Sequence, residues 1–231
     1  FIPVSEKVEN SIPAPKPAKF YFPTWLKEMP NYTEDSNGGQ QFTATQCTPF
    51  TDSFTVGYIQ ELYCDVRITH KGKNLTTGAD IVAYEWAGEH RPIDTRMERI
   101  GAPNLFPKFP GYYNAEFHWF TQWEPQTPPG YSTMYHHPSN RFDLPFHTLT
   151  GIIDTDKWQV GGPLPFVIKE GFEGVIPAGT PIYQMTFVKR DKWESSEAKF
   201  DAKKTGRMIY KAKRHLKGGY KREFWERKRY D

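Results

Sequence analysis

Four histidines and two carboxylates in the middle of the chain could bind a metal ion. They are His118, His136, His137, His147, Glu116 and Asp143. Imidazole together with carboxylate suits zinc or non-haem iron. Two ligands on one strand must be separated by one residue to project from the same face, whereas His136 and His137 are adjacent. We therefore favour a hydrogen-bonding or interface role for these histidines. A metal-dependent β-sandwich enzyme that uses His136 and His137 is kept as an alternative.

A second set of chemistry-bearing residues lies between positions 124 and 188. It comprises PPGY at 128–131, HHPSNR at 136–141, GIIDTD at 151–156, FVIK at 166–169 and GTPIYQ at 179–184. This order and spacing resembles the trimeric dUTPase and dCTP deaminase superfamily, whose fold is the β-clip. The resemblance implies that Asp154 orients or activates the attacking water and that Ser139 contacts a phosphate. Hydrolysis of a phosphoanhydride also needs donors and usually a metal ion, here Mg²⁺, around the phosphates.

The chain departs from that pattern at several positions. Lys157 stands where an aromatic residue usually follows the second aspartate, and Ser139 lacks the flanking Arg and Gly. No aspartate follows Gly57-Tyr58, and the C-terminus is rich in Lys and Arg instead of forming a glycine-rich lid. We expect the fold to be retained and the active site to be lost, because a fold does not confer activity. A nucleotide hydrolase that uses Asp154, Ser139 and Mg²⁺ is the alternative; our main interpretation needs no cofactor.

The whole chain carries a further resemblance. The Pro-rich aromatic start, CTPFTDSFTVGY at 47–58, PPGYSTMYHHPSNRFDLPF at 128–146 and the terminal Phe-Trp among basic residues resemble a family of uncharacterised proteins of tailed phages, including those of marine bacteria. The resemblance implies a viral origin and no defined activity. Phages also use β-clip folds in trimeric head decoration proteins, so it is compatible with a structural role.

The elements that would position these residues are strands. Twenty Pro and 18 Gly among 231 residues leave little room for long helices and exclude a helical bundle. About ten short segments between 41 and 190 are rich in β-branched and aromatic residues and are separated by Pro and Gly corners, with a long excursion at 88–114. We predict an all-β domain over 41–190, a β-clip or a jelly-roll-like sandwich, closed by a hairpin that contains Gly179 to Gln184.

Two arms flank that domain. Residues 1–40 form a Pro-rich extended arm that contains several aromatic residues, including Trp25. We expect this arm to pack either on its own domain or across a neighbouring subunit. Residues 191–231 form a basic helical tail that begins near Ser195 or Ser196. From Lys189 to Asp231 the chain carries 16 Lys and Arg against 7 Asp and Glu, so the basic charge is concentrated in the tail.

These features predict a non-enzymatic, phage-type structural or assembly protein, a virion component that binds neighbouring subunits through its arms. The expected binding residues are Trp25, Phe224, Trp225, Arg222 and Arg227. The expected partners are other protein subunits in a homo-oligomer, with a trimer as the candidate, and nucleic acid is an alternative partner of the tail. No membrane span or signal peptide is recognisable, so we expect a virion or host-cytoplasm protein that is not secreted. Cys47 and Cys64 are expected to be reduced and buried.

Overall fold

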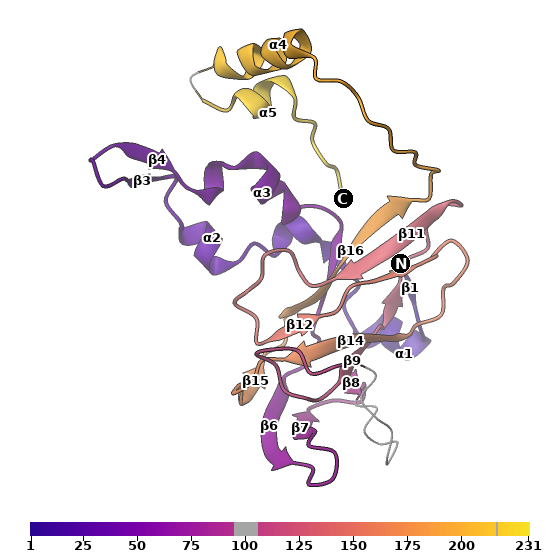
Figure 1. The fold of residues 1–231 in the computed structure, drawn as a ribbon. Helices are drawn as coiled ribbons and strands as arrows, with labels where there is room; N and C mark the ends of the chain where they lie inside the picture. Colours follow the sequence, from indigo (N-terminus) through magenta and orange to yellow (C-terminus); the bar gives the residue numbers. More distant parts are fainter. Residues whose placement is uncertain (95–105, 216) are drawn as a thin grey trace. The chain divides into compact units, whose positions relative to one another are not determined.

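The chain forms two compact units, each built from segments that are distant in the sequence (Figure 1). The computed structural model describes residues 1–94, 106–215 and 217–231. Unit 1 consists of residues 1–18 and 57–190, and unit 2 of residues 19–56 and 191–231. This grouping differs from the three sequential segments expected above, because residues 1–18 belong to the β-rich unit and residues 41–56 do not.

Unit 1 is made of antiparallel sheets. Its strands are β1 (Ile2–Pro3), β2 (Lys16–Pro17), β5 (Tyr58–Glu61), β6 (Val66–Lys73), β7 (Asp80–Trp86), β8 (Ile93–Asp94), β9 (Phe117–Phe120), β10 (Trp123–Glu124), β11 (Tyr131–His136), β12 (Phe146–Thr148), β13 (Gly151–Ile153), β14 (Pro163–Ile168), β15 (Gly174–Ile176) and β16 (Pro181–Lys189). The sheet orders are β13-β11-β16-β5-β2, β12-β14-β9-β8, β15-β6-β7 and β1-β10. The all-β class is thus confirmed for the described residues.

One aromatic-rich core joins three of these sheets. Trp119 of β9 and Phe166 of β14 stack with ring centroids 3.7 Å apart and are fully buried. Tyr183 from β16 and Ile68 from β6 belong to the same cluster. Burying one such side chain stabilises the fold by roughly 1.5–3 kcal/mol relative to leaving it exposed. Each strand is therefore most stable when the face that carries its apolar residues points into the core.

The first 18 residues pack on unit 1. β1 pairs with β10 and β2 pairs with β5, while Val8 of helix α1 (Glu6–Ser11) and Ile12 are buried. The Trp123 indole N–H donates to the carbonyl of Ile12 at 3.0 Å. Of the two alternatives for the arm, packing on its own domain holds for this stretch. Pro17 is tolerated because β2 is an edge strand, where a missing N–H breaks no ladder.

Unit 2 is mainly helical, contrary to the strands expected after residue 41. It contains η1 (Ala18–Phe20, whose first residue belongs to unit 1), α2 (Thr24–Glu28), β3 (Tyr32–Glu34), β4 (Gln40–Phe42), η2 (Ala44–Gln46), α3 (Thr48–Ser53), α4 (Ala202–Lys213) and α5 (Gly219–Glu223). Pro49 lies in the first turn of α3, where a proline needs no N–H and its fixed φ suits the helix. Residues 32–42, most of which belong to the expected extended arm, contain the β3–β4 hairpin.

The tail helix begins later than the sequence predicted. Asp201, and not Ser195 or Ser196, is the N-cap of α4, and its carboxylate accepts the N–H of Lys204 at 2.8 Å. A carboxylate at this position satisfies one of the four unpaired N–H groups and opposes the positive end of the helix dipole. Residues 191–200 have no regular secondary structure and are exposed.

The expected closing hairpin is absent from the described residues, because its two strands belong to different sheets. β15 pairs with β6, whereas β16 pairs with β11 and β5. Gly179 and Thr180 exchange backbone hydrogen bonds with Leu62 instead of with β15. The two cysteines were expected to be buried, but Cys47 is exposed and Cys64 is half-buried. Residues 95–105 of the predicted excursion lie outside the described ranges.

Candidate functional site

Asp154 and Asp156 follow β13 and meet one arginine at the end of β16. The Ser132 hydroxyl donates to Asp154 Oδ1 at 2.7 Å, and Arg190 Nη1 lies 3.1 Å from the same oxygen. Arg190 Nη2 donates to Asp156 Oδ2, which also accepts the N–H of Gly130 at 2.9 Å. Arg190 therefore connects the start of β11, the end of β13 and the end of β16.

The electrostatics of this cluster favour an ionised Asp156. Hydrogen bonds from Arg190 and from the Gly130 N–H lower the pKa of Asp156 to about 2. Asp154 shares the same guanidinium, because its Oδ1 forms an ion pair with Arg190 Nη1. A carboxylate whose pKa is as low as that of Asp156 is a weak general base at pH 7. Sequence reasoning missed Arg190, which lies three residues before Trp193 and outside the dUTPase-like motifs.

Ser139 does not share a site with Asp154 within one chain. Asp154 comes directly after Ile153, which pairs with Thr133 near the start of β11. Ser139 lies beyond the opposite end of β11, which ends at His136. The strand from Ser132 to His136 alone spans about 13 Å at 3.3 Å per residue. The Ser139 backbone N–H donates to the Gln184 side chain at 2.9 Å. The two residues implied by the dUTPase resemblance are therefore separated in one copy of the chain.

His137 and His147 form a stacked pair beside the core. Their ring centroids are 4.5 Å apart, and His137 Nδ1 accepts the N–H of Thr148 at 3.2 Å. Its Nε2 must then carry the proton that is donated to the Arg141 carbonyl at 3.0 Å. Burial lowers the pKa of His137 to about 4, so the ring is neutral at pH 7. Both of its nitrogens are occupied, which leaves none for a metal ion.

The remaining members of the proposed histidine and carboxylate set are dispersed. His136 Nδ1 donates to the His137 carbonyl at 2.8 Å, and burial lowers its pKa. His118 lies 3.0 Å from Glu116, and Asp143 pairs with Arg141. Within the ranges that the structure describes, no three histidine, cysteine or carboxylate side chains are grouped closely enough to hold a metal ion.

A buried Glu124 lies in the core of unit 1, and no sequence pattern indicated a charged group there. Glu124 is 2% exposed and accepts the Tyr135 hydroxyl at 3.0 Å, with the Tyr183 ring 5.8 Å from that of Tyr135. Burial raises the pKa of all three groups. Since each is at most 2% exposed, the cluster orients core side chains and does not face a dissolved substrate.

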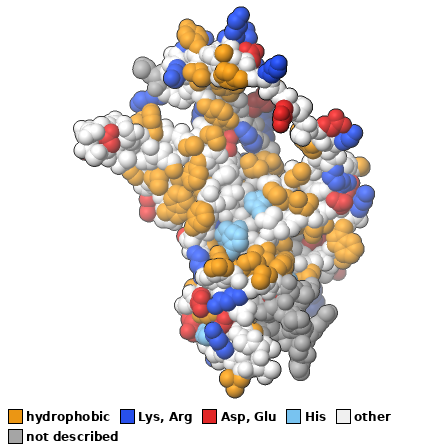
Figure 2. All heavy atoms as spheres, viewed as in Figure 1, with side chains coloured by type: hydrophobic (Ala, Val, Ile, Leu, Met, Phe, Trp, Pro, Cys, Tyr) orange, Lys and Arg blue, Asp and Glu red, His pale blue; other side chains and the backbone are white. Residues whose placement is uncertain are grey.

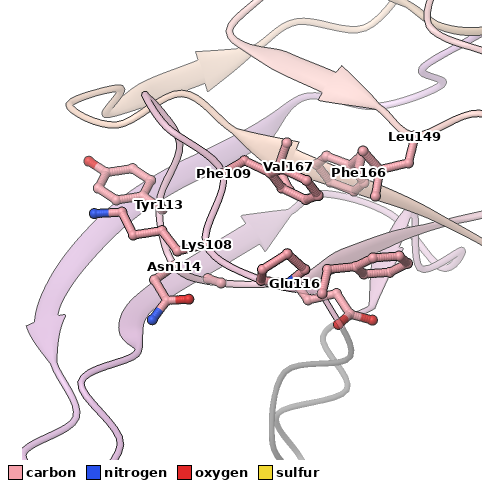
Figure 3. A pocket seen from close by; sticks show the side chains of 11 residues that line it. Lys108, Phe109, Tyr113, Asn114, Glu116, Leu149, Phe166 and Val167 are labelled. Atoms are coloured by element: carbon pink, nitrogen blue, oxygen red, sulfur yellow. The ribbon is translucent and has the colours of Figure 1, made fainter.

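The hollow drawn in Figure 3 is too small for an organic ligand. It is lined by side chains such as Phe109, Tyr113, Glu116 and Phe166, but its interior volume is ≈ 10 Å³. That is about the space of a single water molecule. A wider hollow of ≈ 580 Å³ lies beside β15 and is lined mainly by apolar side chains, among them Phe172 and Val175. Neither hollow contains Asp154 or Ser139.

Both tryptophans expected to bind a partner contact helix α3 of the same unit. Trp25 packs against Phe50 and Phe54, with centroids 6.4 and 6.1 Å apart. The Trp225 indole N–H donates to Asp52 at 2.7 Å, and Lys228 pairs with the same carboxylate at 3.0 Å. One short helix thus holds the two ends of unit 2 together, which the sequence did not indicate.

The other predicted binding residues of the tail face outward. Phe224 is 38% exposed, Arg222 is exposed, and Arg227 lines a hollow of ≈ 430 Å³ together with Trp225 and Lys228. Figure 2 shows hydrophobic and basic side chains gathered over α4 and α5. The structure brings Trp225 and Arg227 together and leaves Trp25 in a separate aromatic cluster.

Comparison with known proteins gives no independent indication of function. No protein-family model matches the sequence, and no curated protein is significantly similar to it. Among the described residues, no helix combines the length and the apolar character that crossing a bilayer requires.

Proposed function

We propose that this protein is a structural subunit of a larger assembly, a virion component of the tailed-phage type, and that unit 2 joins it to neighbouring subunits. The observation that carries the proposal is the surface of the tail. Helices α4 and α5 bury no side chain, and large apolar side chains remain exposed on them and on residues 191–200 before them. These are Trp193 (86%), Phe200 (80%), Tyr210 (71%), Met208 (50%), Ile209 (49%), Tyr220 (46%) and Phe224 (38%).

An ordered helix with no buried side chain is marginal in water by itself, because most helical stability in proteins comes from packing an apolar face. A partner that covers Met208 and Ile209 supplies that packing, and clustered exposed apolar groups mark such contacts. We propose a second copy of this chain as the partner, in a closed homo-oligomer with a trimer as the candidate. The virion or the host cytoplasm is the proposed location.

The test is the sedimentation of the full chain beside two variants. Met208→Glu with Ile209→Glu should yield a lighter particle, because burying two carboxylates in an apolar contact is costly. Leu75→Glu is the matched control: Leu75 is fully exposed in unit 1, so its variant should sediment like the parent. A monomeric parent, or a tail variant that assembles like the parent, would refute the proposal.

The hydrolase alternative is supported by the motif order alone. Against it, Asp154 is engaged by Ser132 and Arg190, and Ser139 lies at the other end of β11. We expect no turnover of dUTP or dCTP with Mg²⁺ above background. Turnover that disappears in Asp154→Asn would restore the enzyme.

A further inference from the structure

Helix α4 carries its basic side chains on one face. At 3.6 residues per turn, Lys203, Lys204, Arg207 and Lys211 fall within an arc of about 100°. Ile209 falls on the opposite side of the helix, and Met208 borders the basic arc about 40° from Lys204. Within the described residues none of the four cations has an ion pair, and all four are exposed. The first turn of α4 contains no acidic residue.

The packing of α5 leaves this face open. A Cβ atom on Gly219 would lie 1.9 Å from the carbonyl oxygen of Ala212, so the start of α5 is in backbone contact with α4 at Ala212. Ala212 lies on the Met208 and Ile209 side of α4, away from Arg207. At the end of the helix, Glu223 of α5 pairs with Arg214 at 2.6 Å.

The spacing suits a chain of phosphates. Lys203, Arg207 and Lys211 are four residues apart, so their Cα atoms follow one another at about 6 Å along the axis. This is close to the separation of successive phosphates on one nucleic acid strand. Tyr210, 71% exposed, flanks the same face next to Lys203 and Arg207 and offers a ring on which an unpaired base can stack.

We propose that the basic face of α4, defined by Lys203, Lys204, Arg207 and Lys211 with Tyr210, binds single-stranded nucleic acid through its phosphates. The proposal extends the assembly function and does not rest on it, because the assembly surface is the Met208 and Ile209 side. Uncompensated cations in a row favour a polyanion, and the neighbouring exposed aromatic favours a nucleic acid over an acidic protein.

The experiment measures fluorescence anisotropy of a labelled 20-nucleotide single strand with the full chain between 50 and 300 mM salt. Four phosphate contacts predict a slope of log K against log salt near −2.8, at about −0.7 per contact. Arg207→Glu with Lys211→Glu should weaken binding about tenfold or more and make the slope shallower by about 1.4. Lys192→Glu with Lys199→Glu changes the net charge equally on residues 191–200 and should bind nearly like the parent.

Tyr210→Ala separates nucleic acid from other polyanions. It should weaken binding of the single strand about fivefold or more and leave a duplex of equal length nearly unaffected. Far-UV circular dichroism checks that each variant keeps its helix. Equal losses in the α4 variant and its control would overturn the proposal. So would binding of poly-aspartate as tightly as the oligonucleotide, which would assign an acidic protein as partner. The α4 variant should sediment like the parent, so the two proposals fail independently.

Discussion

Gly57 occupies a position that no other residue can take without moving the backbone. Its φ is +78°, and a Cβ atom there would lie 1.9 Å from the carbonyl oxygen of Met185 in the neighbouring strand β16. Gly130 also has a positive φ, +87°, but has open space where a Cβ would lie. A substitution at Gly130 therefore introduces only backbone strain, whereas one at Gly57 introduces backbone strain and a steric clash.

We expect Gly57→Ala to lower the free energy of unfolding by about 3 kcal/mol or more, since the clash is with backbone and cannot be relieved by a rotamer. Gly130→Ala should cost only about 1–2 kcal/mol, the strain of a left-handed L-residue. Urea unfolding of the two variants measures the difference. Equal midpoints would mean that β5 and β16 separate readily at Gly57.

Two buried groups make stability depend on pH with opposite signs. His137 has its pKa lowered from 6.5 to about 4, so between these values the unfolded chain binds more protons and stability falls as pH falls. Burial raises the pKa of Glu124 above 4.5, so the native state keeps its proton longer and stability falls as pH rises above 4.5. In the wild type the two effects oppose each other, and burial lowers the pKa of His136 and His147 in the same direction as that of His137.

Single variants should resolve these effects. Between pH 4.5 and 6.5, His137→Gln removes the gain in stability with rising pH, and Glu124→Gln removes the loss. Relative to wild type, the urea midpoint of His137→Gln should therefore rise less with pH, and that of Glu124→Gln should rise more. Parallel profiles for the three proteins would show that neither group titrates differently in the folded state.

At the level of secondary structure, local pattern and long-range pairing were predictable to different degrees. The strand segments of unit 1 were recognised because alternating β-branched and aromatic residues reflect a half-buried sheet, as in β7 and β14. The short helices η2 and α3 were missed because a proline such as Pro49 marks turns as well as the first turn of a helix. The pairing of β16 with β5 and β11 depends on contacts more than 40 residues apart, which no local pattern contains.

The candidate site shows the same division. Asp154 and Ser139 were identified by motif order, but their separation follows from the register of β11 with β13, which the sequence does not display. Arg190 was missed because it matters only where β16 ends beside Gly130. The α3 contacts of Trp25 and Trp225 join residues far apart in the chain, so the sequence could not distinguish them from contacts with a partner.

The N-cap of α4 offers a prediction at this scale. Since α4 buries no side chain, its stability depends strongly on local terms, and Asp201→Ala should cost about 1 kcal/mol. Amide hydrogen exchange in 202–213 should then be about fivefold faster. Ser195→Ala with Ser196→Ala, which alters the caps that the sequence suggested, should leave the exchange unchanged. Faster exchange in the serine variant would place the helix start earlier.

For the whole molecule, the division into two units predicts that unit 1 folds alone. Its core cluster contains only residues of 57–190, and the segment 19–56 leaves and re-enters the unit at adjacent points. The Ala18 N–H donates to the Gly57 carbonyl at 3.0 Å, and β2 pairs with β5 directly beside this bond. A short turn of Gly and Ser can therefore replace 19–56 without displacing either strand.

A chain of residues 1–18, a four-residue Gly-Ser turn and 57–190 should give a β-rich circular dichroism spectrum and unfold cooperatively in urea. Closing the shorter loop costs less chain entropy than closing the native segment, since that cost grows with the logarithm of loop length. The shortened chain should also sediment as a monomer at concentrations where the full chain assembles, because it lacks Met208, Ile209 and the rest of unit 2. A shortened chain that folds and still assembles would move the assembly surface to unit 1. One that fails to fold would show that the sheets need unit 2 for their stability.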